Sequence, residues 1–361
     1  MNKSILIICT SLNLGGSERQ AVWLANQLSE KGFDVIYVSL KEPGILSNKI
    51  SPNVTVKNFE IGRQRNRMFK IIKFCNGVLN LRKLVKEMNE IVIISFLFHS
   101  NLVGKLVKIL TSHKIKHVIA FRSDRLSKRD SNINRFRTTI FKRFIVDSRS
   151  LVVFNSNSGF NNMKLKKVKQ KIIYNAPINA PINLPMSNNI AYVGRLDKLK
   201  NLQNLILAIA LLPIESALKL HIYGSGPERE ALKDLVFQEK LESKVIFKGI
   251  DESISNKLQS YKAVVLTSTH EAFSNILIET MNSSRIPIST LAGDAEELLS
   301  NNRGILIDGY SPDKIYEAII KLENLSNEDL KKIQQNAKTF VNNNLTENLI
   351  IDQWIDTVRN F

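Results

Sequence analysis

Short apolar segments alternate with helical segments along the whole chain, and a single stretch rich in proline and asparagine interrupts the alternation. That stretch, residues 175–189, has the sequence NAPINAPINLPMSNN and no hydrophobic periodicity. Alternating strands and helices predict a parallel sheet with helices on both faces. Since the pattern occurs on both sides of the interruption, we expect an α/β protein with two doubly wound, Rossmann-like sheets. The length of 361 residues also exceeds what one ordinary core holds.

The predicted elements divide the chain into an N-terminal domain at residues 1–176, a linker at 177–189 and a C-terminal domain at 190–361. We expect the last helix to be able to pack back on the N-terminal domain. In open α/β sheets ligands bind at the carboxyl ends of the strands, so we expect a site in a cleft between the domains. Strands are expected at residues 4–10, 33–40, 54–59, 91–96, 116–121, 151–154, 190–193, 218–223, 244–247, 263–266, 286–289 and 305–307, and helices at 17–31, 202–212, 227–239 and 275–281.

Positive charge is concentrated in the first half. Residues 1–176 contain 32 Lys and Arg against 10 Asp and Glu, a balance of +22, whereas residues 177–361 balance to −4. A basic half attracts polyanions, either nucleic acid or an anionic membrane surface. The chain has no helix-turn-helix, RNA-binding aromatic pattern or zinc signature, so we expect no nucleic acid partner.

The two cysteines, Cys9 and Cys75, are too few for a disulfide framework and favour a reducing compartment. No stretch reaches the length of about 18 uncharged apolar residues that a membrane-spanning helix needs. The first residues lack the A-x-A pattern of a cleaved signal and instead predict a buried strand. We therefore expect a cytoplasmic protein.

Two glycine-containing motifs follow predicted strands. G-G-S-E-R, at residues 15–19, opens the first helix, where Gly16 lets backbone approach a ligand and free amides favour an anion. I-Y-G-S-G-P-E, at residues 222–228, forms a second permissive loop around Gly224, with Pro227 suited to a first helical position. A tight turn without a ligand explains either motif about as well.

A basic motif, Y-V-G-R-L-D-K-L-K-N, occupies residues 192–201 at the end of the first strand of the second domain. Arg195 and Lys200 lie five residues apart across a strand-to-helix turn, beside Gly194. A guanidinium and an ammonium group that converge there suit a diphosphate. Two exposed surface cations are the alternative.

The most specific motif is H-E-A-F-S-N-I-L-I-E at residues 270–279, which places Glu271 and Glu279 eight positions apart. A strand precedes it, and an apolar helix begins near Asn275, so Glu271 is expected in the loop and Glu279 on the helix. Carboxylates accept hydrogen bonds from vicinal hydroxyls, so the pair suits a sugar and a ribose. The amides of Phe273, Ser274, Asn275 and Ile276 favour negative charge. A capping acid and a solvated helical acid are the alternative.

Taken together, these motifs resemble the retaining GT-B-fold glycosyltransferases of family four, typified by bacterial lipid and polysaccharide glycosyltransferases. The resemblance covers nearly the whole chain, and its most specific element is the E-x7-E pattern. The sequence departs from the family at Ala272, where glycine is usual, and at Ser274, where proline is frequent. Both departures concern sugar selectivity more than activity.

The resemblance implies roles for individual residues. Arg195 and Lys200 would bind the donor diphosphate, Glu279 the ribose hydroxyls and Glu271 the donor sugar. Gly16 would bring backbone close to the phosphates. His99, in S-F-L-F-H-S-N after a predicted strand, matches a histidine that often faces the donor sugar, although a lone histidine is more often structural.

It further implies a hexosyltransferase that uses a nucleotide-diphosphate sugar, most commonly a UDP-sugar, and retains configuration without a cofactor. The chain contains no Asp-x-Asp, so we expect no metal. Cations must then neutralise the departing nucleotide. The leaving phosphate would take the acceptor proton, and we identify no protein general base.

The acceptor is expected on the basic half. Residues 62–86 mix basic and apolar side chains, which suits an anionic membrane surface, and an ordinary packed helix with exterior lysines is the alternative. We predict a peripheral enzyme on the inner face of the cytoplasmic membrane that acts on a lipid-linked, polyprenyl-diphosphate saccharide for cell-surface glycans. The acceptor-side candidates are Arg122, Arg67, Lys70 and Lys73, and a second basic cluster comprises Arg125, Lys128, Arg129, Arg135, Arg137, Lys142 and Arg143.

Three other functions fit parts of the pattern. A nucleotide-sugar epimerase shares the architecture, and a polyanion-binding protein would use only the basic half. A nicotinamide-dependent enzyme fits poorly, because the first strand leads into N-L-G-G-S-E and not G-x-G-x-x-G.

Overall fold

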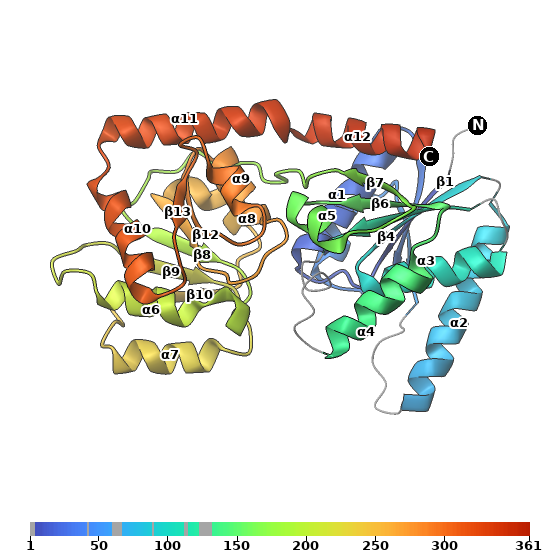
Figure 1. Cartoon of the computed structure of the whole chain (residues 1–361), viewed down its shortest axis with the longest axis horizontal. Helices are drawn as coiled ribbons and strands as arrows, with labels where there is room; N and C mark the ends of the chain where they lie inside the picture. The colour runs from blue at the N-terminus through green and yellow to red at the C-terminus, as the bar shows by residue number, and fades with distance from the viewer. Residues whose placement is uncertain (1–3, 42, 60–66, 89, 112–114, 123–131) are drawn as a thin grey trace. The chain divides into compact units, whose positions relative to one another are not determined.

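The structure, a computed structural model, describes residues 4–41, 43–59, 67–88, 90–111, 115–122 and 132–361. It comprises two compact units (Figure 1). Unit 1 contains residues 1–175 and 348–361, and unit 2 contains residues 176–347. The expected pair of doubly wound sheets is confirmed, since each unit holds one parallel sheet. Among the described residues, no helix is long and apolar enough to cross a membrane.

Unit 1 is built on a seven-stranded sheet with the order β3-β2-β1-β4-β5-β6-β7, and every neighbouring pair is parallel. The central strand β1 pairs with both β2 and β4, and all its residues after Ser4 are fully buried. The strands are β1 (Ser4–Cys9), β2 (Asp34–Ser39), β3 (Thr55–Asn58), β4 (Ile91–Phe96), β5 (Lys116–Phe121), β6 (Ser150–Phe154) and β7 (Lys169–Ile172).

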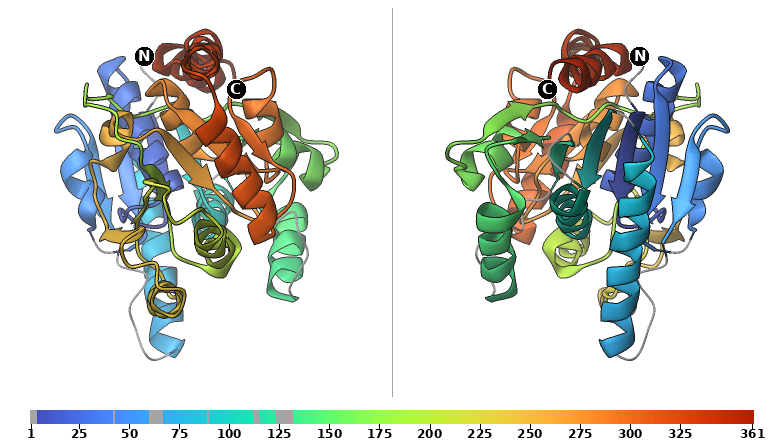
Figure 2. Two further views of the ribbon diagram at one scale, coloured as in Figure 1. Left: turned by 90° about the vertical axis from the view of Figure 1, so that its left-hand side faces the viewer. Right: turned by 90° about the vertical axis from the view of Figure 1, so that its right-hand side faces the viewer.

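Helices cover both faces of this sheet. On one face, apolar residues of α2 and α3 pack against β1, β2 and β4, and the two helices lie side by side (Figure 2). On the other face, Trp354 of the C-terminal helix packs on Phe96, with ring centroids 6.4 Å apart. The helical elements are α1 (Gly16–Glu30), η1 (Ile45–Lys49), α2 (Arg67–Lys86), α3 (Phe98–Thr111), α4 (Asn132–Ile140), η2 (Phe141–Ile145), α5 (Asn157–Met163) and α12 (Glu347–Asn360).

Unit 2 has a six-stranded parallel sheet with the order β10-β9-β8-β11-β12-β13. Its strands are β8 (Ile190–Val193), β9 (Leu220–Tyr223), β10 (Val245–Gly249), β11 (Ala263–Leu266), β12 (Ile286–Thr290) and β13 (Ile305–Ile307). Its helical elements are η3 (Lys198–Lys200), α6 (Leu202–Ala210), α7 (Arg229–Gln238), η4 (Ile254–Ser260), α8 (Asn275–Asn282), α9 (Ala295–Leu299), α10 (Pro312–Asn324) and α11 (Asn327–Asn344).

The segment expected as a linker, 177–189, forms neither helix nor strand, but it is attached to unit 2. The Asn179 side-chain amide donates to the Ser255 carbonyl at 3.1 Å and to the Ser283 hydroxyl at 2.9 Å. The backbone amide of Ile182 donates to the Asn256 carbonyl at 2.8 Å. These hydrogen bonds satisfy backbone and side-chain groups that a free linker would leave to water.

The C-terminal helix is part of unit 1 from Asn348 onward, so the C-terminal sequence range 190–361 spans both units. Lys171 of β7 holds α12 in place by donating to Asp356 at 3.0 Å and to Thr357 at 3.3 Å. Arg359 lies over the ring of Phe33 at 5.8 Å. The strand β7 was not predicted, because its sequence KQKI lacks an apolar run.

Candidate functional site

The loop after β8 carries the predicted cations Arg195 and Lys200. The Asp197 carboxylate accepts a hydrogen bond from the Leu199 amide at 3.1 Å and so caps the short η3 helix. The Tyr192 hydroxyl donates to the Arg195 carbonyl at 2.8 Å. The Arg195 side chain is 71% exposed, and its Nε lies 3.6 Å from Asp197. The backbone of this loop is therefore fixed, while the guanidinium of Arg195 stays accessible.

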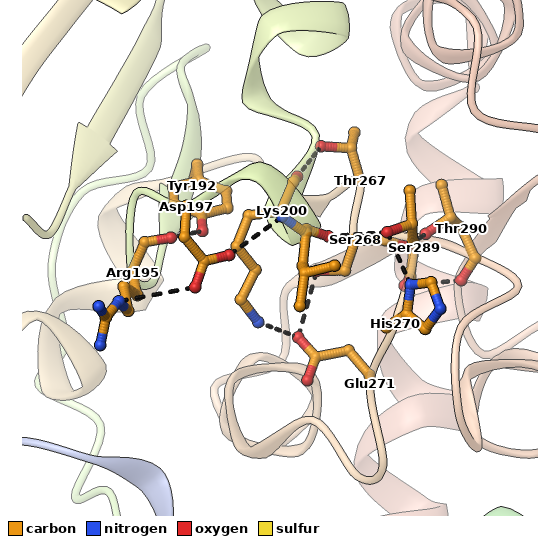
Figure 3. Close-up of polar contacts among 12 residues, drawn as sticks. Tyr192, Arg195, Asp197, Lys200, Thr267, Ser268, His270, Glu271, Ser289 and Thr290 are labelled. Atoms are coloured by element: carbon orange, nitrogen blue, oxygen red, sulfur yellow. Dashed lines mark hydrogen bonds and ion pairs between the residues drawn. The ribbon is translucent and has the colours of Figure 1, made fainter. Parts of the chain in front are cut away.

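Lys200 and Glu271 form an ion pair, which joins two motifs that lie far apart in the sequence (Figure 3). Ser268 donates to the same Glu271 oxygen at 3.2 Å. The Thr267 hydroxyl donates to the Lys200 carbonyl at 2.9 Å. Both side chains are about one-fifth exposed, at 21% and 20%. The predicted diphosphate cation and the predicted sugar-binding carboxylate are thus adjacent at the carboxyl edge of the unit 2 sheet.

The glycines of the loop after β9 allow it to pack tightly on the loop after β8. Gly224 has φ +133°, and a Cβ there would lie 1.9 Å from the Gly194 carbonyl oxygen. A Cβ at Gly226 would lie 2.1 Å from the Leu196 carbonyl oxygen. Only glycine fits at such contacts. The Leu196 amide donates to the Ser225 carbonyl at 3.0 Å, which holds the two loops together.

The E-x7-E motif spans the loop after β11 and the first turns of α8. Glu279 is fully buried, and its carboxylate accepts a hydrogen bond from Ser255 of η4 at 2.6 Å. Burial of a carboxylate requires such a partner. The residues between the two acids are Ala272, Phe273 and Ser274, which are buried, and Asn275 and Ile276, which are partly buried and open the helix. Ala272 adopts no positive φ, so alanine is tolerated where the family usually has glycine.

In unit 1, His99 lies in the first turn of α3, directly after β4. Leu97, the residue before the start of α3, has φ +71°, which is strained for a side chain of this size. Desolvation, followed by the positive charges of Arg137 and Lys41, lowers the pKa of His99. Both effects favour the neutral form of the imidazole.

Gly16 is exposed and begins α1. The neighbouring Glu18 folds back over this helix start, since a Cβ at Gly15 would lie 2.2 Å from a Glu18 carboxylate oxygen. Ser11 donates to Glu18 at 3.3 Å. Burial raises the pKa of Glu18. The carboxylate at the helix start was not among the predicted site residues, although it belongs to the G-G-S-E-R motif.

The acceptor-side candidates are only partly described. Arg122 directly follows β5, with its guanidinium carbon 5.4 Å from the Phe96 ring centre and 5.7 Å from that of Trp354. Lys73 lies on α2 and is partly buried. Arg67 and Lys70 also belong to α2, but their side chains lie outside the described residues.

Comparisons with known proteins find relatives and structural neighbours among glycosyltransferases. A family model for glycosyl transferases group 1 matches residues 178–340. The chain is 28% identical over 346 residues to the Campylobacter jejuni GalNAc-α-(1→4)-GalNAc-α-(1→3)-diNAcBac-PP-undecaprenol α-1,4-N-acetyl-D-galactosaminyltransferase, covering 93% of this chain and 94% of that relative. It is 26% identical to the N-acetylgalactosamine-N,N'-diacetylbacillosaminyl-diphospho-undecaprenol 4-α-N-acetylgalactosaminyltransferase of the same organism, over 92% of this chain and 93% of the relative.

Among solved structures, Anabaena HepE in complex with UDP and glucose superposes with a TM-score of 0.84 at 18% identity and covers 100% of both chains. The lipopolysaccharide glycosyltransferase WaaG superposes with a TM-score of 0.73 at 14% identity, over 98% of this chain and 99% of that one. The chain is a GT-B glycosyltransferase.

In this glycosyltransferase the family match lies wholly within unit 2, which carries Arg195, Lys200 and the E-x7-E motif. The match favours sugar transfer over the nucleotide-sugar epimerase that the sequence left open. The supporting residues Ser255, Ser268 and Asn179 were missed by sequence reasoning. Ser255 lies 24 positions from the carboxylate that it contacts, and no local pattern connects the two.

Proposed function

We propose that this glycosyltransferase transfers a hexose from a nucleotide-diphosphate sugar, a UDP-sugar in the first instance, to a polyprenyl-diphosphate-linked saccharide. Transfer proceeds with retention of configuration and without a metal. The product is an intermediate of a bacterial cell-surface glycan, assembled at the inner face of the cytoplasmic membrane.

The ion pair between Lys200 and Glu271 is the observation that supports this function best. A sugar joined to a diphosphate needs a cation for the phosphates and a hydroxyl acceptor for the sugar within one sugar length. Lys200 and Glu271 supply both groups side by side, on loops that further hydrogen bonds hold in place. When the donor binds, its sugar hydroxyls take the place of Lys200 as the partners of Glu271. Its phosphates attract the ammonium group of Lys200.

The chemistry follows from where charge develops. As the glycosidic bond to the nucleotide breaks, negative charge accumulates on the departing diphosphate. Lys200 and the exposed guanidinium of Arg195 neutralise this charge in place of a metal. The departing phosphate takes the proton of the acceptor hydroxyl on the same face of the sugar, which gives retention. Glu279, fixed by Ser255, holds the ribose.

The lipid-linked acceptor is supported by two relatives of nearly full length, both named for undecaprenol-linked substrates. The charge of this chain agrees with such a substrate, since residues 1–176 carry a balance of +22. A diphosphate that links a saccharide to a lipid is anionic and is attracted to a basic unit.

The membrane surface is supported by exposed apolar side chains among the basic ones of unit 1. On α4, Ile133 is 64% exposed and Phe136 is 66% exposed, and Arg135 and Arg143 are exposed nearby. On α2, Ile71 is 57% exposed. A helix that offers both kinds of side chain binds at the interface of an anionic bilayer. Of the other members of the second basic cluster, Arg137 and Lys142 are partly buried, and Arg125, Lys128 and Arg129 lie outside the described residues.

Thermal-shift titration with UDP, GDP and ADP tests the donor site. We expect one nucleotide to stabilise the protein by about 2.7 kcal/mol at a concentration one hundred times its Kd. Lys200→Ala and Glu279→Ala should abolish this stabilisation, whereas Lys198→Ala, an exposed cation two positions away, should retain it. Absence of stabilisation by every nucleotide would remove the donor site from the proposal.

Flotation with liposomes tests the membrane surface. We expect the protein to float with vesicles that contain anionic phospholipid and to remain behind with neutral ones. Phe136→Glu should weaken flotation, whereas Phe237→Glu, on the exposed face of α7 in unit 2, should not. Equal binding to neutral and anionic vesicles would contradict this part of the proposal.

A further inference from the structure

Arg122 occupies an unusual position at the carboxyl edge of the unit 1 sheet. It is the first residue after β5. Its guanidinium carbon lies 5.4 Å from the centre of the Phe96 ring and 5.7 Å from that of Trp354. Trp354 belongs to α12 and is 2% exposed, so the guanidinium is held between a strand end and the C-terminal helix. Two aromatic rings fix where this cation lies.

The charge of Arg122 has no anionic partner among the described residues. Its Nε and Nη1 have no exposed surface and no hydrogen-bond acceptor in that part of the chain. The residue as a whole is partly exposed, so its solvent-facing surface belongs to its other atoms. Burial lowers the pKa of Arg122 to about 9, which leaves the group charged at neutral pH.

This arrangement costs folding free energy. An isolated buried charge without a hydrogen-bonded partner is unfavourable. The interaction with two aromatic faces offsets only part of that cost. Elsewhere in unit 1 the buried cations Lys105 and Lys108 are both paired with Asp147. Arg122 differs from these lysines, because an anion that balances its charge has to come from outside the described residues.

A second unsatisfied group lies beside it. Phe121 pairs with Phe154 across β5 and β6, so the next residues, Arg122 and Asn155, follow side by side at the strand ends. Alternation along the two strands directs both toward the same face of the sheet. Asn155 is 4% exposed, and its Oδ1 has no donor among the described residues. Among the described residues, the Arg122 guanidinium thus lacks a hydrogen-bond acceptor and the Asn155 Oδ1 lacks a donor, although the two residues are neighbours.

We propose that Arg122 and Asn155 form a subsite for a sugar phosphate, in which the guanidinium binds a phosphate oxygen and Asn155 accepts a hydrogen bond from the attached sugar. The proposal deepens the proposed function and rests on it, because the ligand becomes the phosphate-bearing end of the lipid-linked acceptor. Phosphate is the anion that a planar guanidinium binds best, and a sugar supplies the hydroxyl or amide donor.

The indole of Trp354 reports directly on this subsite. The chain contains two tryptophans, Trp23 and Trp354, so Trp23→Phe leaves Trp354 as the single emitter. Titration of this variant with N-acetylglucosamine 1-phosphate should change the emission in a saturable manner, because the anion neutralises the cation beside the ring. Inorganic phosphate should bind more weakly, and N-acetylglucosamine without phosphate should give no change.

Variants of Arg122 then test the assignment. Arg122→Gln should weaken binding of the sugar phosphate by about 10- to 100-fold, the range expected for one charge-assisted hydrogen bond. Arg122→Lys keeps the charge and should lose less than about tenfold. Arg149→Gln removes the same charge from an exposed position of unit 1 and should change nothing. Equal binding by wild type and Arg122→Gln would overturn the proposal.

Thermal stability separates a ligand site from a structural role. Removal of an uncompensated cation should leave the Tm of Arg122→Gln unchanged or raised, whereas a fall of several degrees with undiminished sugar-phosphate binding would show a structural role instead. UDP should stabilise Arg122→Gln as it does the wild type, because the donor site lies in unit 2. If UDP fails with both proteins while the sugar phosphate binds through Arg122, the donor proposal fails and this one stands.

Discussion

Units 1 and 2 share a fold but treat the charges at the carboxyl edges of their sheets differently. In unit 2 the cations of the site lie beside carboxylates: Lys200 pairs with Glu271, and Arg195 lies near Asp197, while the buried Glu279 accepts a hydrogen bond from the neutral hydroxyl of Ser255. In unit 1, Arg122 has no anionic partner among the described residues, and desolvation together with the positive charge of Arg137 lowers the pKa of His99.

This difference agrees with the ligands proposed for each unit. Unit 2 is proposed to bind a ligand with both a diphosphate and hydroxyls, and Lys200 and Glu271 satisfy each other until that ligand is bound. Unit 1 is proposed to bind an anionic ligand and carries a surplus of positive charge, at a cost in stability. A paired site is preorganised without net charge, whereas an unpaired site attracts its ligand over a longer range.

The largest effect is expected from breaking the pair in unit 2. Lys200→Ala removes the cation that is proposed to face the departing diphosphate, and it leaves Glu271 without this ionic partner. We expect kcat/KM to fall by about 10²- to 10³-fold, as for loss of one group that stabilises transition-state charge. A transfer assay with the donor identified by thermal shift measures this loss. Lys198→Ala serves as the control, and a comparable loss in that variant would show that the charge acts without specific placement.

The tight contact between the loops after β8 and β9 should respond next most strongly. Gly224→Ala places a Cβ 1.9 Å from the Gly194 carbonyl oxygen at a positive φ of +133°. We expect a loss of about 3 kcal/mol in the free energy of unfolding, from overpacking and backbone strain together. Gly249→Ala is the matched control, because φ there is +72° with no atom within 4 Å of the added Cβ. Its cost should be about 1 kcal/mol. Equal losses would mean that backbone conformation alone matters.

Asp147 allows the paired cations of unit 1 to be compared with Arg122. Its carboxylate lies 3.1 Å from Lys108 and also pairs with Lys105, and both lysines are about nine-tenths buried. Asp147→Asn leaves two buried cations unpaired, and we expect a loss of about 2 kcal/mol, less than for a fully buried pair because the carboxylate is 25% exposed. Denaturant unfolding measures this loss. An unchanged midpoint would show that unit 1 tolerates unpaired cations generally.

The pH dependence of this contribution has a definite sign. Burial acts to raise the pKa of Asp147, but hydrogen bonds from Lys105, Ser150 and Lys108 outweigh it and hold the pKa well below its usual range. A carboxyl group with a lowered folded-state pKa contributes its full stabilisation above its unfolded value, near 3.8. The stabilisation is lost as pH falls below that value toward the folded-state pKa. The difference between wild type and Asp147→Asn should therefore be constant from pH 5 to 7 and shrink under more acidic conditions.

The same contrast explains what the sequence could predict. Strand and helix positions, the two sheets, and the adjacency of Lys200 and Glu271 follow from local patterns, because strand ends of a parallel sheet meet at one edge. The partners Ser255 of Glu279 and Trp354 of Arg122 come from distant segments that carry no motif. Strand β7 escaped prediction because an edge strand of mostly polar residues lacks the hydrophobic signature. The assignment of residues 348–361 to unit 1 depends on tertiary packing.

The smallest effect concerns the positive charges around His99. Desolvation is the largest cause of its lowered pKa, and Arg137 contributes next. Arg137→Gln removes that charge and should raise the pKa of His99 only in part toward its ordinary value, because desolvation, the larger cause, remains. NMR titration of the imidazole protons measures the shift. Arg143 lies in η2, which follows α4, and is not among the causes of the lowered pKa. Arg143→Gln should therefore leave the titration of His99 unchanged. A rise confined to Arg137→Gln would show that unit 1 controls its site through uncompensated charge, whereas unit 2 controls its own through pairing. An unchanged titration would assign the lowered pKa to desolvation alone and weaken that contrast.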